Sequence, residues 1–402
     1  MFTERWFPIL AGTFLVGALF DVLSLTTFAA ALFTLLLVTS WWRWHALDGV
    51  IYSRKPFYRR AFPGESVALE LEVENRKILP LSWLRIDDPW PRSVGPEDED
   101  QLAPSHLLEQ GLLTNVFSLR WFERAKRAYQ LRFRKRGVYK IGPARMQSGD
   151  VFGMHDLSRQ VGTSELLTVF PELLPIESLD LPTEDPFGDR RTRRRLFEDP
   201  TQTIGVRDYQ PEDSFRRVHW PATARTGRLQ VKEFQPTSAR IVVVCLNVST
   251  FERHWEGVYP ELLERLVSVA ATLSHDYIRK GFQVGLMSNG CLAHSDRTFR
   301  IPPGRSPKQL GYLLEALAGV TPMVMKPFDR FLMREMPKTY YGASLLVVTA
   351  VHPPELIETL NTLKLKGRRI TLYSIAEEPP PFLSGILSVH QPFIEEASEM
   401  KE

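Results

Sequence analysis

The feature that most constrains this chain is a long apolar stretch near its N-terminus. Residues Trp6–Trp42 contain one charged side chain, that of Asp21. As a single helix this stretch would be roughly 55 Å long, whereas the apolar core of a bilayer is about 30 Å thick. Two shorter helices, Trp6–Phe20 and Leu23–Trp42, fit a bilayer better, with a turn at Asp21 between them. The sequence therefore predicts a two-helix transmembrane hairpin over residues 1–44.

Basic residues lie on both sides of this hairpin and predict its orientation. Arg5 precedes it, and the basic residues that follow it are Arg43, Arg54, Lys55, Arg59 and Arg60. Because basic flanks stay in the cytoplasm, we expect a multi-pass protein of the cell membrane whose globular part faces the cytoplasm. The tryptophans near the ends of the stretch are typical of interfacial anchors; they are Trp6, Trp41, Trp42 and Trp44.

Two other interpretations of the apolar stretch compete with the hairpin. A cleaved signal peptide needs only one apolar block, and no small-residue cleavage site precedes the second block. A single tilted span, with its first segment in the interface, would instead export the rest of the chain. The two cysteines, Cys245 and Cys291, lack metal-ligand spacing and suit a reducing compartment, which favours the hairpin.

Length and charge set limits on the remaining sequence. The chain of 402 residues is long enough for two or three domains, each with its own core. Its 50 basic and 47 acidic residues give a formal net charge of +3. This balance gives no global signal for nucleic acid or for acidic substrates.

A β pattern fills residues 45–168. Ser66–Asn75 alternates apolar and polar side chains with a period of two, and Tyr129–Arg134 and Val138–Ile141 repeat the pattern. In the first of these segments, the side chains expected to face a core are Val67, Leu69, Leu71 and Val73. Turn-bounded strands of this kind predict an antiparallel β-sandwich.

An α/β pattern fills residues 240–390, followed by a polar tail over residues 391–402. Ile241–Leu246 is a continuous apolar run, typical of a strand buried on both faces, and Tyr259–Lys280 has the periodicity of an amphipathic helix. The further predicted elements are strands at Phe282–Met287, Leu345–Thr349 and Arg369–Ile375, and helices at Lys308–Leu317 and Pro354–Lys366. This alternation predicts a mostly parallel, doubly wound sheet.

Between the two patterns, residues 169–239 form a connector with a distinctive motif. Arg190–Arg228 holds ten arginines. The motif resembles the signature of the DUF58 family, and the matching residues are Gly205, Arg207, Tyr209, Asp213, Arg216, Trp220, Ala224, Arg225, Leu229, Val231 and Lys232. One position departs from the family pattern, because Glu212 stands where the family has glycine.

The DUF58 resemblance implies an architecture and a partner. It implies that the α/β region is similar to a von Willebrand factor A domain, and that the protein works with a MoxR-type AAA+ ATPase. Such proteins act as adaptors in the maturation or assembly of other proteins. The resemblance therefore implies a membrane-anchored, non-catalytic interaction protein with these motif residues holding or forming a docking surface: Arg207, Tyr209, Asp213, Arg216, Trp220, Arg225 and Lys232.

The motif itself allows more than one role. As a structural lock, Asp213 would cap the turn Ser214–His219, the side chains of Arg216, Arg217 and Trp220 would pack and pair, and Arg207 and Arg225 would meet Asp208, Glu212 or Asp213. As a docking surface, the arginines would bind an acidic partner. Nucleic-acid binding lacks a recognition fold, and acidic residues interleave with the basic ones. The run Arg190–Arg195 would also suit an anionic lipid surface.

A degenerate metal site follows the first predicted α/β strand. Von Willebrand A domains often bind Mg²⁺ through D-x-S-x-S at this place, since the ion prefers a carboxylate and hydroxyl oxygens. Here the corresponding residues are Asn247, Ser249 and Phe251. Asn247 lacks the charge and Phe251 has no ligand atom, so we expect no metal cofactor. Asn247 and Ser249 would instead satisfy backbone groups in a turn.

The remaining polar side chains include three candidates for catalysis. Asp213, His219 and Ser249 offer an acid, a base and a hydroxyl, but their spacing matches no nucleophile elbow or zinc motif. The chain also has no P-loop or dinucleotide-binding glycine motif before a helix. We therefore expect a protein that is not an enzyme. The alternative is a metal-dependent or hydrolytic enzyme of cell-envelope metabolism.

Overall fold

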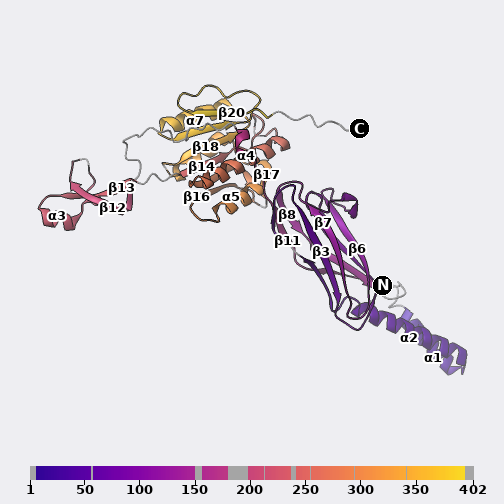
Figure 1. Cartoon of the computed structure of the whole chain (residues 1–402). Helices are drawn as coiled ribbons and strands as arrows, with labels where there is room; N and C mark the ends of the chain where they lie inside the picture. Colours follow the sequence, from indigo (N-terminus) through magenta and orange to yellow (C-terminus); the bar gives the residue numbers. More distant parts are fainter. Residues whose placement is uncertain are drawn as a thin grey trace. The chain divides into compact units, whose positions relative to one another are not determined.

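The computed structural model divides the chain into two compact units, Met1–Phe170 and Pro171–Glu402 (Figure 1). The structure describes residues 6–55, 58–149, 156–179, 198–211, 213–236, 241–253, 255–293, 295–340 and 342–393. The Arg190–Arg195 run and residues 394–402 of the tail lie outside the described residues.

The first unit begins with two apolar helices, α1 (Trp6–Leu19) and α2 (Leu23–His45). The chain reverses at Asp21, which has a φ of 52°, and the ring of Phe7 meets that of Phe33 edge to face at 5.5 Å. The two predicted helices and the turn between them are thus present. Residues Leu23–Trp42 of α2 are long and apolar enough to cross a membrane, whereas α1 is shorter. Crossing by both helices stays a prediction.

A β-sandwich follows the helices. Its strands are β1 (Val50–Lys55), β2 (Arg60–Ala61), β3 (Ser66–Asn75), β4 (Leu81–Pro91), β5 (Leu102–Pro104), β6 (Gln110–Leu119), β7 (Arg124–Arg132), β8 (Gly137–Ile141), β9 (Ala144–Gly149), β10 (Asp156–Val161) and β11 (Glu165–Val169). They form sheets with the orders β1-β3-β7, β10-β9-β4-β6-β5 and β2-β11-β8. All neighbouring strands are antiparallel except β2 and β11.

The core of the sandwich lies between these sheets. Leu69, Leu71 and Val73 of β3 are buried as their alternation predicts, and they pack with side chains of the facing sheet, among them Trp90 and Ile86. Burial of every second residue on one face is the expected source of sheet stability.

One basic residue that we counted as a membrane flank belongs to this interior instead. The Arg54 side chain is buried, and its Nε and Nη2 atoms donate to the Asp88 carboxylate at 2.8 and 2.6 Å. Tyr52 and Trp90 donate to the same carboxylate at 2.7 and 3.0 Å. The Arg54 charge is therefore neutralised inside the sandwich, and the orientation predicted from the basic flanks stays a prediction.

The second unit contains the α/β domain. Its elements are β14 (Ile241–Leu246), α4 (Pro260–Arg279), β15 (Gln283–Leu292), β16 (Thr298–Gly304), α5 (Gln309–Ala318), β17 (Val320–Val324), α6 (Phe328–Glu335), β18 (Ser344–Thr349), α7 (Pro354–Leu365), β19 (Arg369–Ser374) and β20 (Leu387–His390). The strand order is β16-β15-β14-β18-β19-β20, and β17 pairs with β15. Pairs among β15, β14, β18, β19 and β20 are parallel, as the alternating pattern predicted.

Helices cover both faces of this sheet. Val243 and Cys245 of β14 pack in one core cluster with Phe331 of α6 and Leu360 of α7. Helix α4 contacts β14, β15 and β18 and lies on the other face. Because β14 is covered on both faces, every residue of Ile241–Leu246 is buried.

The signature motif also belongs to the second unit. It forms a hairpin of two strands, β12 (Glu198–Asp208) and β13 (Gln230–Pro236), with the short helices η4 (Phe215–Arg217) and α3 (Trp220–Thr226) between them (Figure 1). The strands are antiparallel, and Arg207 pairs with Val231 in their register.

Candidate functional site

The hairpin has a small apolar interior near its closed end. Val218, which follows η4, forms an isolated antiparallel bridge with Val231 of β13, and both side chains are buried. This bridge folds the connecting segment back onto the strand. The conformation of the segment is then fixed by polar contacts around Asp213 and His219.

An ion pair joins strand β12 to the turn that follows it. Nη1 and Nη2 of Arg207 each lie 2.6 Å from a different carboxylate oxygen of Asp213. Asp213 Oδ2 also accepts a hydrogen bond from the backbone N–H of Gln210 at 3.0 Å. The predicted contact between Arg207 and Asp213 is confirmed. Oδ2 of Asp213 thus accepts from a residue that precedes it, and the predicted cap on the turn Ser214–His219 stays a prediction.

Helix α3 is capped at both ends by side-chain and backbone geometry. His219 Nδ1 accepts a hydrogen bond from the N–H of Ala222 at 3.0 Å, which makes His219 the N-cap residue. At the other end Gly227 adopts a left-handed conformation with a φ of 67°. Thr223 Oγ1 then accepts from the N–H of Gln230 at 3.0 Å, which ties α3 to β13. His219 therefore has a structural role here.

Large aromatic side chains project from this framework into solvent. Phe215 is 67% exposed and Trp220 is 64% exposed. The ring of Tyr209 contacts that of Phe215 in a tilted arrangement, with centroids 5.4 Å apart and an interplanar angle of 32°. Arg225 and Arg228 are exposed on the last turn of α3 and just beyond it. We call Phe215, Trp220, Arg225 and Arg228 the aromatic–basic surface.

The other predicted motif residues are distributed around this surface. Trp220 leaves most of its ring in solvent rather than packing inside the motif. Within the described part of the hairpin, Arg225 forms no ion pair with Asp208 or Asp213, and its predicted pairing with Glu212 involves a residue outside the described ones. Lys232 is half-buried in β13. Glu212 and the side chain of Arg216 lie outside the described residues.

A second candidate site lies at the carboxyl end of β14. Asn247 Oδ1 accepts from the N–H of Ser249 at 3.1 Å, as predicted for a turn, and Asn247 Nδ2 donates to Thr349 Oγ1 at 3.0 Å. Asn289 of β15 donates through Nδ2 to Asn247 Oδ1 at 3.1 Å and to Ser249 Oγ at 3.4 Å. Its Oδ1 accepts from the N–H of Val248 at 3.0 Å.

This network does not fit a divalent cation. The N–H group of Asn289 faces the same two oxygens, on Asn247 and Ser249, that a cation would need as ligands. Within the described ranges, no three His, Cys, Asp or Glu side chains are grouped so that they could hold a metal ion. Asn289 was missed at the sequence level. Asn289 lies in β15, the strand beside β14. Because neighbouring parallel strands end at the same edge of a sheet, this position was the signal that could have placed Asn289 near Asn247.

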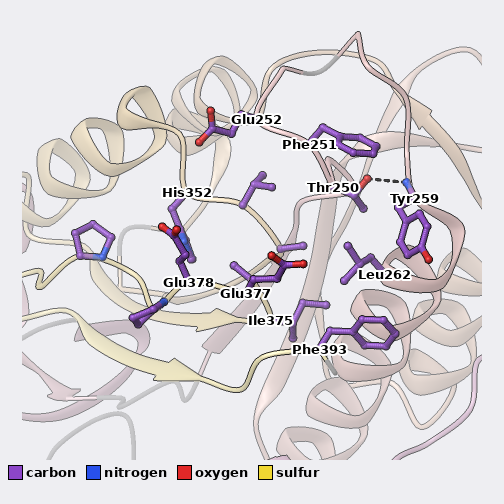
Figure 2. Close-up of a pocket in the computed structure, with 15 residues that line it drawn as sticks. Thr250, Phe251, Glu252, Tyr259, Leu262, His352, Ile375, Glu377, Glu378 and Phe393 are labelled. Carbon is purple, nitrogen blue, oxygen red and sulfur yellow. Dashed lines mark hydrogen bonds between the residues drawn. The ribbon is translucent and has the colours of Figure 1, made fainter. Parts of the chain in front are cut away.

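A cavity of about 800 Å³ opens at the same edge of the sheet, beyond the ends of β14, β18 and β19. Figure 2 shows Tyr259, Leu262 and Phe393 on one side of it and His352 with Glu378 on the other. Thr250 Oγ1 accepts from the N–H of Tyr259 at 2.7 Å. Burial lowers the pKa of His352, and nearby His390 adds to the effect. The cavity thus has an apolar wall and an acidic rim.

Comparisons with known proteins bear on the motif. Residues 205–360 match the family model described as "Protein of unknown function DUF58". The resemblance predicted from the motif is therefore confirmed over this range. A relative among curated proteins, "Uncharacterized protein YeaD" of Bacillus subtilis (strain 168), is 23% identical over 319 residues, which cover 78% of this chain and 73% of YeaD.

Two of the solved structures that match this chain each cover about a third of it. AvmM, which catalyses macrocyclization in alchivemycin A biosynthesis, is 14% identical with a TM-score of 0.22, over 32% of this chain and 93% of AvmM. Spo0M, a sporulation control protein from Bacillus subtilis, is 15% identical with a TM-score of 0.19, over 31% of this chain and 50% of Spo0M.

Proposed function

We propose that this protein is a membrane-anchored, non-catalytic interaction protein that docks a protein partner through its aromatic–basic surface. The observation that carries the proposal is the exposure of Phe215 and Trp220 on a hairpin whose shape is fixed by Arg207 and Asp213. Aromatic residues and arginine dominate the binding energy of protein interfaces when they are held out on a rigid scaffold.

The charge of this surface supports an acidic partner. Arg225 and Arg228 are exposed on the same connecting segment as the two aromatic residues, and the guanidinium group binds carboxylates in a bidentate geometry. A segment that presents Asp or Glu next to an apolar side chain would satisfy both parts of the surface. The partner we propose is a MoxR-type AAA+ ATPase, acting in the maturation or assembly of other proteins.

The three residues considered for catalysis support a non-catalytic role. The Asp213 carboxylate pairs with Arg207, His219 Nδ1 accepts from the helix that it caps, and Ser249 Oγ accepts from Asn289. In each of the three residues at least one polar atom therefore already serves the fold, whereas a general base or nucleophile must be available to substrate.

The architecture that we propose extends this assignment. Helices α1 and α2 would cross the membrane as a two-span hairpin, with the rest of the chain in the cytoplasm. The α/β domain would be of the von Willebrand A type. In support, its sheet has the order 3-2-1-4-5-6 when the strands β14, β15, β16, β18, β19 and β20 are numbered along the chain.

Co-purification tests the docking proposal. The tagged full-length protein is extracted in detergent with and without ATP, and co-purifying proteins are identified by mass spectrometry. We expect an AAA+ ATPase whose recovery depends on nucleotide, and whose recovery falls at least tenfold in the double variant Phe215→Ala and Trp220→Ala. Trp255→Ala is the matched control, because Trp255 is also an exposed tryptophan but lies outside the hairpin.

Two results would argue against this function. Equal recovery of the ATPase with the double variant would place docking elsewhere on the molecule. Absence of any nucleotide-dependent ATPase from a folded sample would remove the proposed partner.

A further inference from the structure

Three exposed apolar side chains gather at one end of the β-sandwich. Ile78 is 75% exposed, Trp121 is 63% exposed and Phe122 is 65% exposed. Ile78 lies in the loop between β3 and β4, and Trp121 and Phe122 lie in the loop between β6 and β7. We call Ile78, Trp121 and Phe122 the apolar tip. Exposed groups of large apolar side chains mark sites of contact with proteins or membranes.

The two loops that carry the apolar tip are held together by hydrogen bonds. Asn75 Nδ2 donates to the carbonyl of Leu79 at 3.0 Å and to the carbonyl of Arg120 at 2.9 Å. The N–H of Phe122 donates to the carbonyl of Lys77 at 3.3 Å. Ile78 and the two aromatic residues therefore lie side by side rather than on independent loops.

The backbone at Phe122 adds to this arrangement. Phe122 has a φ of 54°, a left-handed conformation that bulky residues rarely adopt. Such strain is kept where the surrounding contacts require it, and it is common at binding sites. At Phe122 the strained backbone carries a phenyl ring that is exposed to solvent. Burial of this ring in the sandwich core therefore does not compensate for the cost of the strain.

The apolar tip lies at the end of the sandwich where helix α2 joins it. Lys77, next to Ile78 in sequence, donates through Nζ to the carbonyls of Ala46 and Asp48, directly after α2. The N–H of Arg76 donates to the carbonyl of Gly49 at 2.8 Å. The last turns of α2 carry two further exposed aromatic side chains, Trp41 and Trp44.

We propose that the apolar tip inserts into the interface of the same phospholipid bilayer that α2 enters. This inference rests on the membrane anchoring proposed above. Tryptophan and phenylalanine are favoured at the level of the lipid headgroups, and the exposed Trp41 and Trp44 belong to the helix end that joins this end of the sandwich. Arg76 and Arg120, both exposed beside the tip, would meet anionic headgroups.

A depth measurement on the full chain tests this inference. Trp121→Cys is labelled with an environment-sensitive fluorophore and reconstituted into vesicles of phosphatidylcholine and phosphatidylglycerol. Quenching by lipids with a spin label near the headgroup is then recorded. The native thiols leave little background, because Cys245 and Cys291 are buried and burial raises the pKa of Cys245. Wild-type protein treated with the same fluorophore measures any labelling of these two native cysteines.

The same strand supplies the control. Leu108→Cys places the label in the loop before β6, whereas Trp121 lies in the loop after β6. Leu108 is 94% exposed, so a label there is in solvent. Because β6 spans Gln110–Leu119, the two labels are separated by about 30 Å. We expect blue-shifted emission and at least threefold stronger lipid quenching at position 121 than at position 108.

Other outcomes overturn the inference in distinguishable ways. A third label at Leu35→Cys, near the middle of the proposed span Leu23–Trp42, reports whether α2 is inserted when it is read with lipids that carry the spin label deep in the acyl chain. If the label at position 35 is quenched, but the labels at positions 121 and 108 both show the emission of a label in water and no lipid quenching, then α2 is inserted and the apolar tip stays out of the bilayer. If position 35 is not quenched, anchoring and tip insertion both fail. A blue shift at 121 that depends on protein concentration and not on lipid quencher would identify a second copy as the occupant.

Discussion

Arg207 and Asp213 form a bidentate ion pair across the closed end of the signature hairpin, with both nitrogen–oxygen distances at 2.6 Å. The Asp213 carboxylate is largely buried, and its Oδ2 atom also accepts a hydrogen bond from the N–H of Gln210. The pair therefore holds the turn in one conformation. This ion pair explains why the motif has an arginine at position 207 and an aspartate six residues later.

We expect that breaking this pair loosens the hairpin. Asp213→Ala should destabilise the hairpin by about 1–3 kcal/mol, because it leaves a partly buried guanidinium without its partner. Arg207→Ala should do the same, and the double variant should lose less than the sum of the two. Hydrogen exchange at the Gln210 and Val231 amides measures the change. Additive effects would show that the two side chains act independently.

Helix α3 should depend on its histidine cap. His219→Ala removes the acceptor for the N–H of Ala222 and should cost about 1 kcal/mol of local stability. His219→Asn is the control, since its side-chain oxygen can accept the same hydrogen bond. Faster amide exchange at Ala222 in the alanine variant alone is the expected result. Equal exchange in wild type and both variants would contradict a capping role.

The amide of Asn289 should be what keeps Mg²⁺ from the end of β14. We expect MgCl2 to leave the thermal unfolding of the wild-type protein unchanged. Asn289→Asp should lower stability by about 2 kcal/mol, because it removes the N–H donor from Asn247 Oδ1 and brings a carboxylate there. Millimolar Mg²⁺ should restore part of this loss, since the site then offers only oxygen ligands. Stabilisation of the wild type by Mg²⁺ would contradict this assignment and favour the enzyme alternative.

The stability of the junction after α2 should depend on pH through Lys77. Burial lowers the pKa of Lys77 from 10.5 to about 8, with the charge of Asp48 opposing the change. The unfolded chain then binds more protons than the folded chain between about pH 8 and 10.5, so the free energy of unfolding should rise with pH in this window. Because Lys77 is half-exposed, we expect a gain on the order of 1 kcal/mol.

Chemical labelling checks the Lys77 prediction directly. The rate of acylation of each lysine is followed by mass spectrometry as pH is varied. Lys77 should titrate near pH 8, whereas Lys126, an exposed lysine whose pKa is raised by Glu70, should titrate well above that. Coincident titration of the two lysines would refute the proposed burial effect.

Periodic segments of the sequence predicted their elements well. The alternation over Ser66–Asn75 corresponds to β3 with the same bounds, and the helix predicted at Tyr259–Lys280 is α4 at Pro260–Arg279. Strand β16, with Pro302 and Pro303 near its end, was not predicted. Edge strands have fewer buried side chains, so their hydrophobic period is weak.

Contacts between distant segments could not be predicted from local patterns. Arg54 and Asp88 are 34 residues apart, and nothing in either neighbourhood indicates that they meet. Asn289 reaches Asn247 only because β15 lies beside β14 in the sheet. The motif pattern also gave no sign that Trp220 would be exposed, because tryptophan is as common in interfaces as in cores.

The junction between α2 and the sandwich has a mechanical consequence. Residues 46–49 connect the end of α2 at His45 to the start of β1 at Val50. The side chains of Ala46 and Leu47 are buried in the sandwich core. Arg159 Nη2 donates a hydrogen bond to Asp48 Oδ1 at 3.0 Å. A segment fixed in this way cannot absorb torsion as a flexible linker does. A rotation of α2 about its axis would therefore turn the whole sandwich with it, so that this junction acts as a rigid coupling rather than a tether.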